Sequence, residues 1–325
     1  GPAEKTRDSY SFHITTDKSA DPGESTLVGF WQPGRVTIAG GISSADIPAF
    51  EKLWTIDILA AELNYKQDNS YSLNLKIRDL LSTQGIGGDA FAFDKRTFLE
   101  RWGTLTALQR FFNQYRPRGQ VDIDLEASGN LDRPSESALA GKVYCKDVSI
   151  CDRKFPYVIE HLIGEVDFTE RSFELKNLTG RHNDVNLVLN GWSKDFGPSW
   201  QYQIQITSDN IALDNDLYNA LSTKQKEFWS AFSPSGVAAI NYCLYRQSET
   251  DKGRILAVKL LNAEAAYRRF PYPLKNLTGE IFFDDEGIAV SDLVSQLNGR
   301  KITLNGKVTK RNTDRLIYDV LIKVD

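Results

Sequence analysis

The stretch at residues 153–159, Arg-Lys-Phe-Pro-Tyr-Val-Ile, decides how this chain is divided, because a close copy of it returns 115 residues further on. The copy occupies residues 268–274 and reads Arg-Arg-Phe-Pro-Tyr-Pro-Leu, and a Gly-Glu pair follows both copies at the same distance. The Leu-Asn-Gly at residues 189–191 also returns at the same interval, at residues 304–306. A constant interval across separate motifs indicates an internal repeat of a whole multi-stranded unit.

The repeat divides the chain into four parts. Residues 1–25 are a polar leader that begins with Gly-Pro, which is typical of a tag scar, and the chain contains no Met, so we expect a piece of a longer protein. Residues 26–118 form a partial repeat that ends in a linker helix. Residues 119–235 form a full β repeat with its own linker helix, and residues 236–325 a second β repeat that is incomplete at its C-terminus. Repetition of this kind predicts a stack of similar units rather than independent domains.

Strict alternation of apolar and polar residues predicts the strands. Residues 121–125, Val-Asp-Ile-Asp-Leu, and residues 185–189, Val-Asn-Leu-Val-Leu, are examples, and turn residues separate such runs at hairpin distances. We therefore expect a mainly β fold: an elongated, curled antiparallel sheet built from repeated multi-stranded units with short linker helices. The residues expected to line its apolar face are Leu73, Leu75, Ile77, Val121, Ile123, Leu125, Val143, Val166, Phe168, Val185, Leu187, Leu189, Tyr202, Ile204, Ile206, Ile240, Tyr242, Val258, Leu260, Ile281, Phe283, Ile302, Leu304, Val320 and Ile322.

Two segments have helical spacing. Large apolar residues recur every three or four positions within residues 97–115, which predicts an amphipathic helix. A second helix is expected to end at about Phe232, and Asp214 and Asp216 just before it are expected to cap it. Residues 47–63 fit both a helical turn and an alternating strand.

The composition excludes several classes of function. A net charge of −4 gives no basic surface of the kind that nucleic acid needs. The sequence has no apolar run near the roughly 18 residues of a membrane-spanning helix. Hydrophobic content of 41% and charged content of 25% are typical of a folded domain.

Nothing in the sequence predicts a catalytic, metal or cofactor site. The three histidines, His13, His161 and His182, belong to no nucleophile or zinc motif. Cys145 and Cys151 would lie roughly 20 Å apart if extended, too far for a disulfide. We interpret the cysteines as small apolar side chains and His161 as part of a solvated turn.

Two aromatic features leave alternatives open. Trp192 and Trp200 have the side chains to stack on sugars, or they pack at a strand crossover. The basic-basic-Phe-Pro-Tyr motif either places cations at the rim of a trough, near lipid head groups, or forms a strand-ending turn whose aromatic residues pack inward.

The alternation also leaves the fate of the apolar face open. The sheet either folds over to make a closed sandwich core, with the helices as plugs, or stays open as an apolar trough that holds acyl chains. Alternation supports both arrangements equally.

The order of motifs resembles the AsmA-like family of bacterial envelope proteins. The resemblance covers roughly residues 70–325 and rests on Leu-Asp-Asn-Asp-Leu at 213–217, a Pro-x-Gly turn, the segment 270–281 (Phe-Pro-Tyr-Pro-Leu-Lys-Asn-Leu-Thr-Gly-Glu-Ile), and Leu-Asn-Gly. The first repeat departs from the pattern, with Val158 in place of the second proline and His161 in place of the asparagine.

The resemblance implies a non-catalytic segment of a bridge-like lipid transfer protein. Its apolar groove would carry phospholipid acyl chains between the inner and outer membranes. It further implies a periplasmic location, further repeats and an inner-membrane anchor in the parent chain, and membrane-anchored partners. The alternatives are a structural envelope scaffold with a closed β-sandwich core and a carbohydrate-binding β-sandwich.

Overall fold

The computed structural model describes residues 10–15, 26–43, 54–82, 114–195, 199–297, 299–310 and 316–324. The described chain is mainly β, with antiparallel strands joined in chain order and short helices, which confirms the predicted fold class. The strands are β1 (Tyr10–Thr15), β2 (Thr26–Gln32), β3 (Arg35–Ser43), β4 (Trp54–Tyr65), β5 (Ser70–Ser82), β6 (Arg118–Asn130), β7 (Arg133–Ile150), β8 (Ile159–Thr169), β9 (Phe173–His182), β10 (Val185–Lys194), β11 (Gln201–Ala212), β12 (Val237–Arg246), β13 (Lys252–Tyr267), β14 (Phe270–Phe283), β15 (Gly287–Leu297), β16 (Arg300–Lys310) and β17 (Leu316–Val324). The helices are α2 (Asn215–Ala220) and α3 (Thr223–Phe232).

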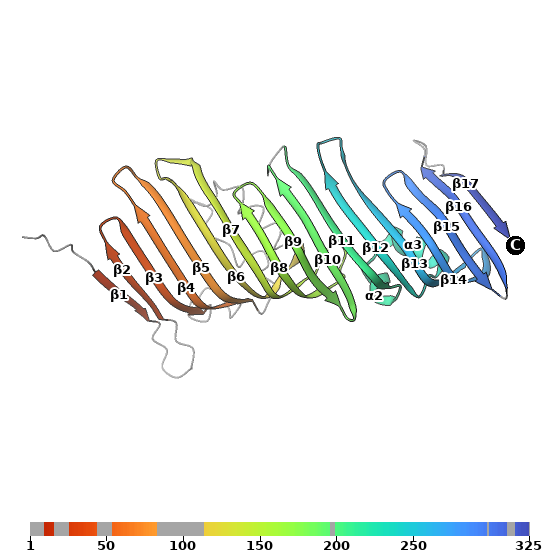
Figure 1. The fold of residues 1–325 in the computed structure, drawn as a ribbon, viewed down its shortest axis with the longest axis horizontal. Coiled ribbons are helices and arrows are strands. Elements are labelled where there is room, and N and C mark those ends of the chain that lie inside the picture. The colour runs from red at the N-terminus through yellow and green to blue at the C-terminus, as the bar shows by residue number, and fades with distance from the viewer. Residues whose placement is uncertain are drawn as a thin grey trace, which may run out of the picture. The chain divides into compact units, whose positions relative to one another are not determined.

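The chain forms two compact units. The first comprises residues 1–150 and 161–176, and the second comprises residues 151–160 and 177–325. In the first unit, each strand from β1 to β7 pairs with the next one along the chain, always antiparallel (Figure 1). In the second unit, the same holds from β10 to β17. Among the described residues of each unit, these paired strands form one layer, with no second sheet facing it.

The internal repeat extends to backbone geometry. Asn177 in β9 and Asp292 in β15, which are 115 residues apart, have positive φ angles of 47° and 46°. The backbone N–H of each donates to an asparagine Oδ1 on the next strand, Asn190 at 2.9 Å and Asn305 at 2.7 Å. Irregularities of this kind add twist and bend a strand, and the strands curve along their length (Figure 1).

His161 lies on the same pattern and corrects one prediction. It was expected in a solvated turn, but it lies within β8 with a φ of 53°, and Asn276 of β14 matches it with a φ of 50°. The His161 ring is exposed and its Nδ1 lies 2.9 Å from Asp147 Oδ1. The prediction of a turn was wrong because a residue with a left-handed backbone conformation can also lie at an irregularity inside a strand.

The helix predicted to end at Phe232 is broken into α2 and α3. Asp214 caps α2 as expected, because its Oδ1 accepts a hydrogen bond of 3.0 Å from the Leu217 backbone N–H. Ser222 then starts a new helix through a capping box with Gln225. The prediction of one helix was wrong because this second capping signal follows the first so closely.

Other predictions lie partly outside the described residues. The amphipathic helix at residues 97–115 is described only at residues 114 and 115, which are helical. Of the ambiguous segment 47–63, the described part belongs to β4 and is a strand. Among the described residues, no helix is long and apolar enough to cross a membrane.

Candidate functional site

The register of the first unit gathers apolar side chains on one surface, which we call its apolar face. Ile77, Ile123 and Val143 lie directly opposite one another on β5, β6 and β7, so their side chains share a side of the sheet. The same pairing continues on β4 and at neighbouring positions. The face is formed by Leu59, Leu63, Leu73, Leu75, Ile77, Val121, Ile123, Leu125 and Val143.

Phe168 of β8 also lies over this face. A Cβ atom added to Gly141 of β7 would lie 2.5 Å from its ring, so the missing side chain makes room for the phenyl group. Val166 is two residues away on the same strand and therefore on the same side of the sheet.

The second unit has an apolar face of its own. Leu189, Ile206 and Tyr242 lie opposite one another on β10, β11 and β12, and Val258 and Ile281 continue the same side on β13 and β14. The face is formed by Leu189, Tyr202, Ile204, Ile206, Ile240, Tyr242, Leu244, Leu256, Val258, Ile281, Phe283, Ile288, Val290, Ile302, Leu304, Val308, Val320 and Ile322.

Most of these side chains remain partly exposed. Val121, Ile123 and Leu125 of the first unit are only half-buried, although β6 has a neighbouring strand on both sides. Ile204 and Ile206 of the second unit are also half-buried. A closed sandwich core would remove such central residues from solvent, so each unit presents accessible apolar surface.

One part of the second unit is closed. Of the predicted lining residues, Val185, Leu187, Leu189 and Leu260 are buried, with Leu187 only 3% exposed. These four lie in packed core, whereas the other predicted residues that are described are partly or largely exposed. That these four residues line a groove therefore stays a prediction, and their burial argues against it.

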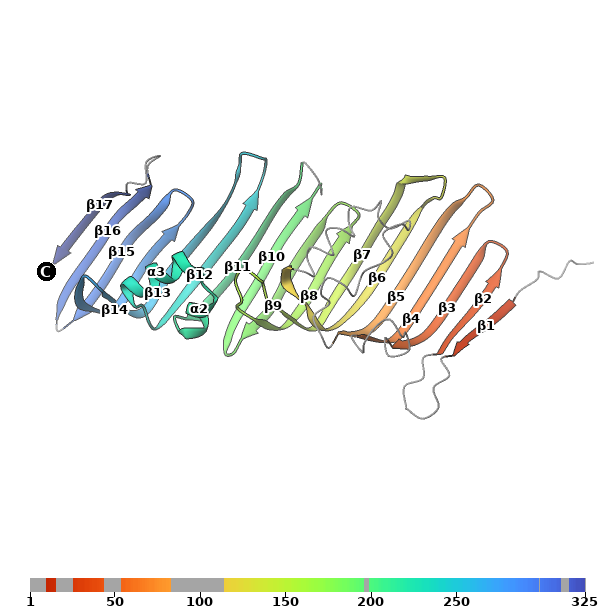
Figure 2. The ribbon, with the colours of Figure 1, turned by 180° about the vertical axis from the view of Figure 1, so that it is seen from behind.

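Helix α3 packs on the apolar face of the second unit. The Phe228 ring meets Phe283 of β14 edge-on at 5.8 Å, and Phe232 stacks on Tyr267 of β13 at 5.0 Å. Figure 2 shows α3 in front of the strands β12 to β14. This aromatic contact was not predicted in its details, although the three- and four-residue spacing of the helix was the signal for it.

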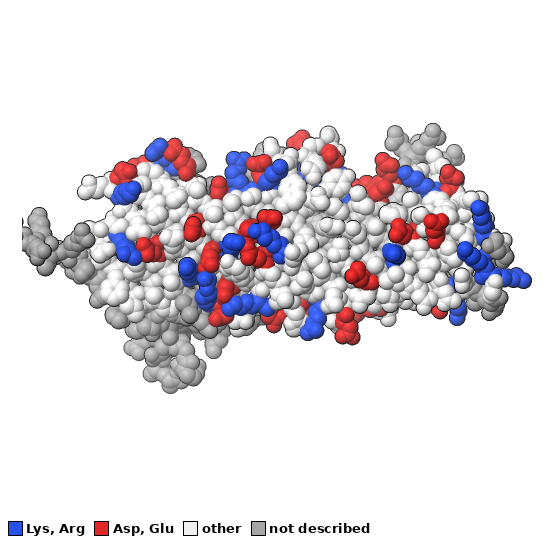
Figure 3. All heavy atoms as spheres, in the orientation of Figure 1, with Lys and Arg blue, Asp and Glu red and all other residues white. Residues whose placement is uncertain are grey.

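The opposite surface of the first unit, which we call the charged face, carries a network of ion pairs. Arg78 bonds Asp124 at 2.6 Å, and Lys146 lies 2.7 Å from Asp79 and 2.9 Å from Asp122. On the surface seen in Figure 3, Lys and Arg side chains (blue) lie beside Asp and Glu side chains (red).

The network continues onto β8 and β9. Lys142 contacts both Glu165 and Asp167, and Lys176 also contacts Asp167. The hydrogen bond from Lys176 holds the pKa of Asp167 at about 2, well below its usual value. Because every cation here faces carboxylates, the network stabilises the sheet rather than forming an open anion site.

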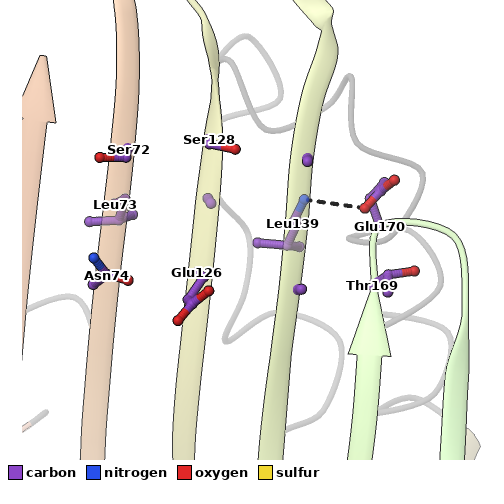
Figure 4. Close-up of a pocket in the computed structure, with 11 residues that line it drawn as sticks. Ser72, Leu73, Asn74, Glu126, Ser128, Leu139, Thr169 and Glu170 are labelled. Carbon is purple, nitrogen blue, oxygen red and sulfur yellow. Dashed lines mark hydrogen bonds between the residues drawn. The ribbon is translucent and has the colours of Figure 1, made fainter.

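A shallow hollow of about 360 Å³ is lined by residues of β5, β6 and β7 and of the end of β8 (Figure 4). Short side chains such as Ser72, Ser128 and Ala138 leave this space. Glu170 lies at one side, where its Oε2 accepts a hydrogen bond of 3.2 Å from the Leu139 backbone N–H. Since that carboxylate already has a partner and the hollow is open, it does not mark a binding site.

The first Phe-Pro-Tyr motif packs partly inward. Tyr157 is buried and its ring lies 3.8 Å from that of His182, whose Nδ1 is 2.7 Å from the Val158 carbonyl oxygen. Burial, with the nearby charges of Asp214 and Asp216, raises the pKa of Tyr157 to about 12. Phe155 is 38% exposed. The interpretation of this motif as a turn whose aromatic residues pack inward therefore holds for Tyr157 but not for Phe155.

The two tryptophans do not form a common platform. Trp200 donates to Ser193 Oγ at 2.7 Å and its ring lies 4.9 Å from that of Tyr202. Trp192 alternates with Ser193 on β10 and so lies on the other side of the sheet, with Lys194 Nζ 5.3 Å from its ring centroid. A sugar stacked on one ring would not reach the other.

The described residues contain no cluster of His, Cys, Asp and Glu able to hold a metal ion. Cys145, Cys151 and Cys243 are free thiols, and burial raises the pKa of Cys145 to about 11, so it is not an activated nucleophile. Comparison of the chain with protein-family models, with curated proteins and with solved structures finds no match.

Proposed function

We propose that this chain is a non-catalytic lipid-binding segment whose apolar faces hold acyl chains. One observation carries the proposal: in each unit, apolar side chains from successive strands line up on one side of the sheet and stay half-exposed, as Ile123 and Ile206 do. A contiguous apolar patch on a protein surface marks an interaction site.

The chemistry of the faces favours an acyl chain over a polar ligand. Leu, Ile and Val dominate the apolar faces, and they offer contact area but no hydrogen bonds. Transfer of an alkyl chain from water onto such a surface gains about 0.8 kcal/mol for each buried CH₂ group. A polar ligand would lose its hydrogen bonds to water without replacing them.

The resemblance to the AsmA-like family extends the proposal. By that analogy the chain is part of a periplasmic bridge that moves phospholipid between the inner and outer membranes, together with further repeats and membrane-anchored partners. Direction and driving force would come from those partners.

Two experiments test the lipid-binding proposal. Lipid extraction and mass spectrometry of the purified protein should find bound phospholipid or fatty acid. A vesicle-to-vesicle transfer assay with fluorescent phospholipid should then compare Val258→Asp with Ala257→Asp. These neighbours lie on opposite sides of β13, so each variant adds one carboxylate to one face.

Val258→Asp should lower binding and transfer by about ten-fold, because a charge cannot be buried beneath an acyl chain. Ala257→Asp should leave both unchanged. Equal effects of the two variants, or a purified protein that neither carries nor takes up lipid, would contradict the proposal.

A further inference from the structure

The first unit contains an apolar cavity of about 350 Å³ where two hairpin turns meet, which we call the turn pocket. It is lined by Leu63, Tyr65, Lys66, Asn69, Tyr71, Leu73 and Leu131. Leu63 and Leu73 are also members of the apolar face, since they pair directly on β4 and β5. The turn pocket is therefore continuous with that face at its hairpin end.

The turns that build the pocket are held together. The Leu131 backbone N–H, in the turn after β6, donates to the Asn69 carbonyl oxygen at 2.9 Å, in the turn after β4. Asn69 Nδ2 also donates to Asp132 Oδ2 at 2.9 Å. A site whose walls are joined this way loses little conformational freedom when a ligand enters.

The polar groups of the two lining tyrosines are already satisfied. Tyr65 OH accepts a hydrogen bond of 3.2 Å from Trp31 Nε1, and Tyr71 OH donates to Ser137 Oγ at 3.1 Å. Both hydroxyl groups are thus engaged beside the pocket, and the rings present apolar surface. The lining recognises aliphatic surface rather than hydrogen-bonding groups.

Size also limits the ligand. Small apolar cavities of about 150 Å³ already hold benzene, so the turn pocket accepts several carbon atoms of a chain. Leu131 is 55% exposed, so the pocket is open to solvent beside it. A chain can therefore run from solvent through the pocket and onto Leu63 and Leu73.

Lys66 is the charged residue of the lining. Asp68 accepts hydrogen bonds from the backbone N–H and the hydroxyl group of Ser70, and Asp132 accepts one from Asn69. The Ser70 hydrogen bonds and the nearby charge of Lys66 lower the pKa of Asp68, so Lys66 has an acidic neighbour. An anionic head group in direct contact with the Lys66 ammonium group would gain a charge-assisted hydrogen bond there, which a cationic head group cannot make.

We propose that the turn pocket binds a single alkyl chain whose anionic head group lies beside Lys66 and whose tail runs over Leu63 and Leu73. This inference rests on the proposed lipid-binding function and adds to it a place, an orientation and a head-group charge.

Titration calorimetry with laurate and dodecyltrimethylammonium tests the proposal, because these two amphiphiles share a chain length and differ in charge. The wild type should bind laurate more tightly. Lys66→Glu should instead bind dodecyltrimethylammonium more tightly than laurate. We expect each of the two affinities to change by about two- to five-fold, the size expected of a surface charge contact. Leu131→Asp should weaken laurate binding by about ten-fold through lost apolar contact.

Matched controls come from the second unit. Leu321, which is 58% exposed, and Lys252, also exposed, allow Leu321→Asp and Lys252→Glu as variants of equal charge change. Neither should alter laurate binding. Circular dichroism should show all four variants folded, because each substitution replaces an exposed side chain.

The outcomes separate this inference from the proposed function. If laurate binding falls in Ile123→Asp but not in Lys66→Glu or Leu131→Asp, the apolar face binds lipid and the turn pocket is refuted. If only the pocket variants lose laurate, the pocket is supported and binding along the face is refuted. A wild type that binds neither amphiphile refutes both.

Discussion

The two copies of the repeat keep one side of the sheet and change the other. On the apolar side, Val143 is matched by Val258, which lies 115 residues later, and Phe168 is matched in the same way by Phe283. On the opposite side, the charged residues of the first copy are replaced. Lys142, Asp167 and Lys176 correspond to Ala257, Phe282 and Ser291.

The difference shows which side of the sheet the repeat preserves. The charged face of the first copy is held by ion pairs, whereas the matching surface of the second exposes Ile255 by 43% and Phe282 by 36%. The ion pairs are therefore a feature of the first copy and not of the repeat. The apolar side recurs because alternation along each strand keeps it apolar, as a chain-binding surface would require.

The largest expected effect separates closed from open parts of the apolar side. Leu189 and Leu304 occupy equivalent positions, but Leu189 is 6% exposed and Leu304 is half-buried. Leu189→Ala should lower the free energy of unfolding by about 2–5 kcal/mol through a cavity, and Leu304→Ala by only about 1 kcal/mol. Urea unfolding of both variants measures this, and equal losses would mean that both positions lie in a closed core.

A smaller effect concerns the turns that start the two copies. Gly119 and Gly236 have positive φ angles of 112° and 103°, and a Cβ on Gly119 would lie 1.9 Å from the Asp147 carbonyl oxygen. Gly119→Ala should therefore lower stability by about 2–3 kcal/mol, and Gly236→Ala by somewhat less.

Thermal unfolding gives the comparison, with Gly299→Ala as the control. Gly299 also has a positive φ angle, of 78°, but open space surrounds its missing side chain, so only backbone strain is expected there. If Gly119→Ala were no worse than Gly299→Ala, close packing at the start of the copies would be disproved.

The smallest effect is on the charged face. The pKa of Asp167 in the folded state is about 2, below the roughly 3.9 of an unfolded chain. Its stabilisation is therefore complete above about pH 4 and is lost as the pH falls toward 2. The free energy of unfolding should fall less between pH 5 and pH 2 in Asp167→Asn than in the wild type. We expect the two decreases to differ by less than about 1 kcal/mol, as measured by urea unfolding at each pH. An unchanged pH dependence would show that the ion pairs contribute nothing.

Alternation along the strands was sufficient to predict the fold class. The alternation underestimated the length of the strands. The hairpin ends, such as residues 126–130 (Glu-Ala-Ser-Gly-Asn), are so polar that they show no alternation of apolar and polar residues. The alternation also assigned both Leu187 and Ile206 to the lining of the apolar face, although only Leu187 is buried. Burial depends on which other elements pack over a position, and that is not encoded in the period of a strand.

The turn pocket was beyond prediction for a related reason. Its walls come from two turns that are far apart in the sequence, around residues 65–71 and at Leu131, and only the pairing of β5 with β6 brings them together. By contrast, Asp214 was correctly expected to cap a helix, because capping depends on the residues next to it.

Site-specific photocrosslinking is the most direct test of lipid binding by the apolar faces. A photoreactive residue would replace Leu125 or its neighbour Glu126 in the first unit, and Leu304 or its neighbour Thr303 in the second, in cells or with added phospholipid vesicles. Because neighbours on a strand point to opposite sides, each pair samples both faces at one place. We expect lipid adducts at Leu125 and Leu304 and none at Glu126 and Thr303. Equal labelling within each pair, or none at all four positions, would contradict lipid binding by the apolar faces.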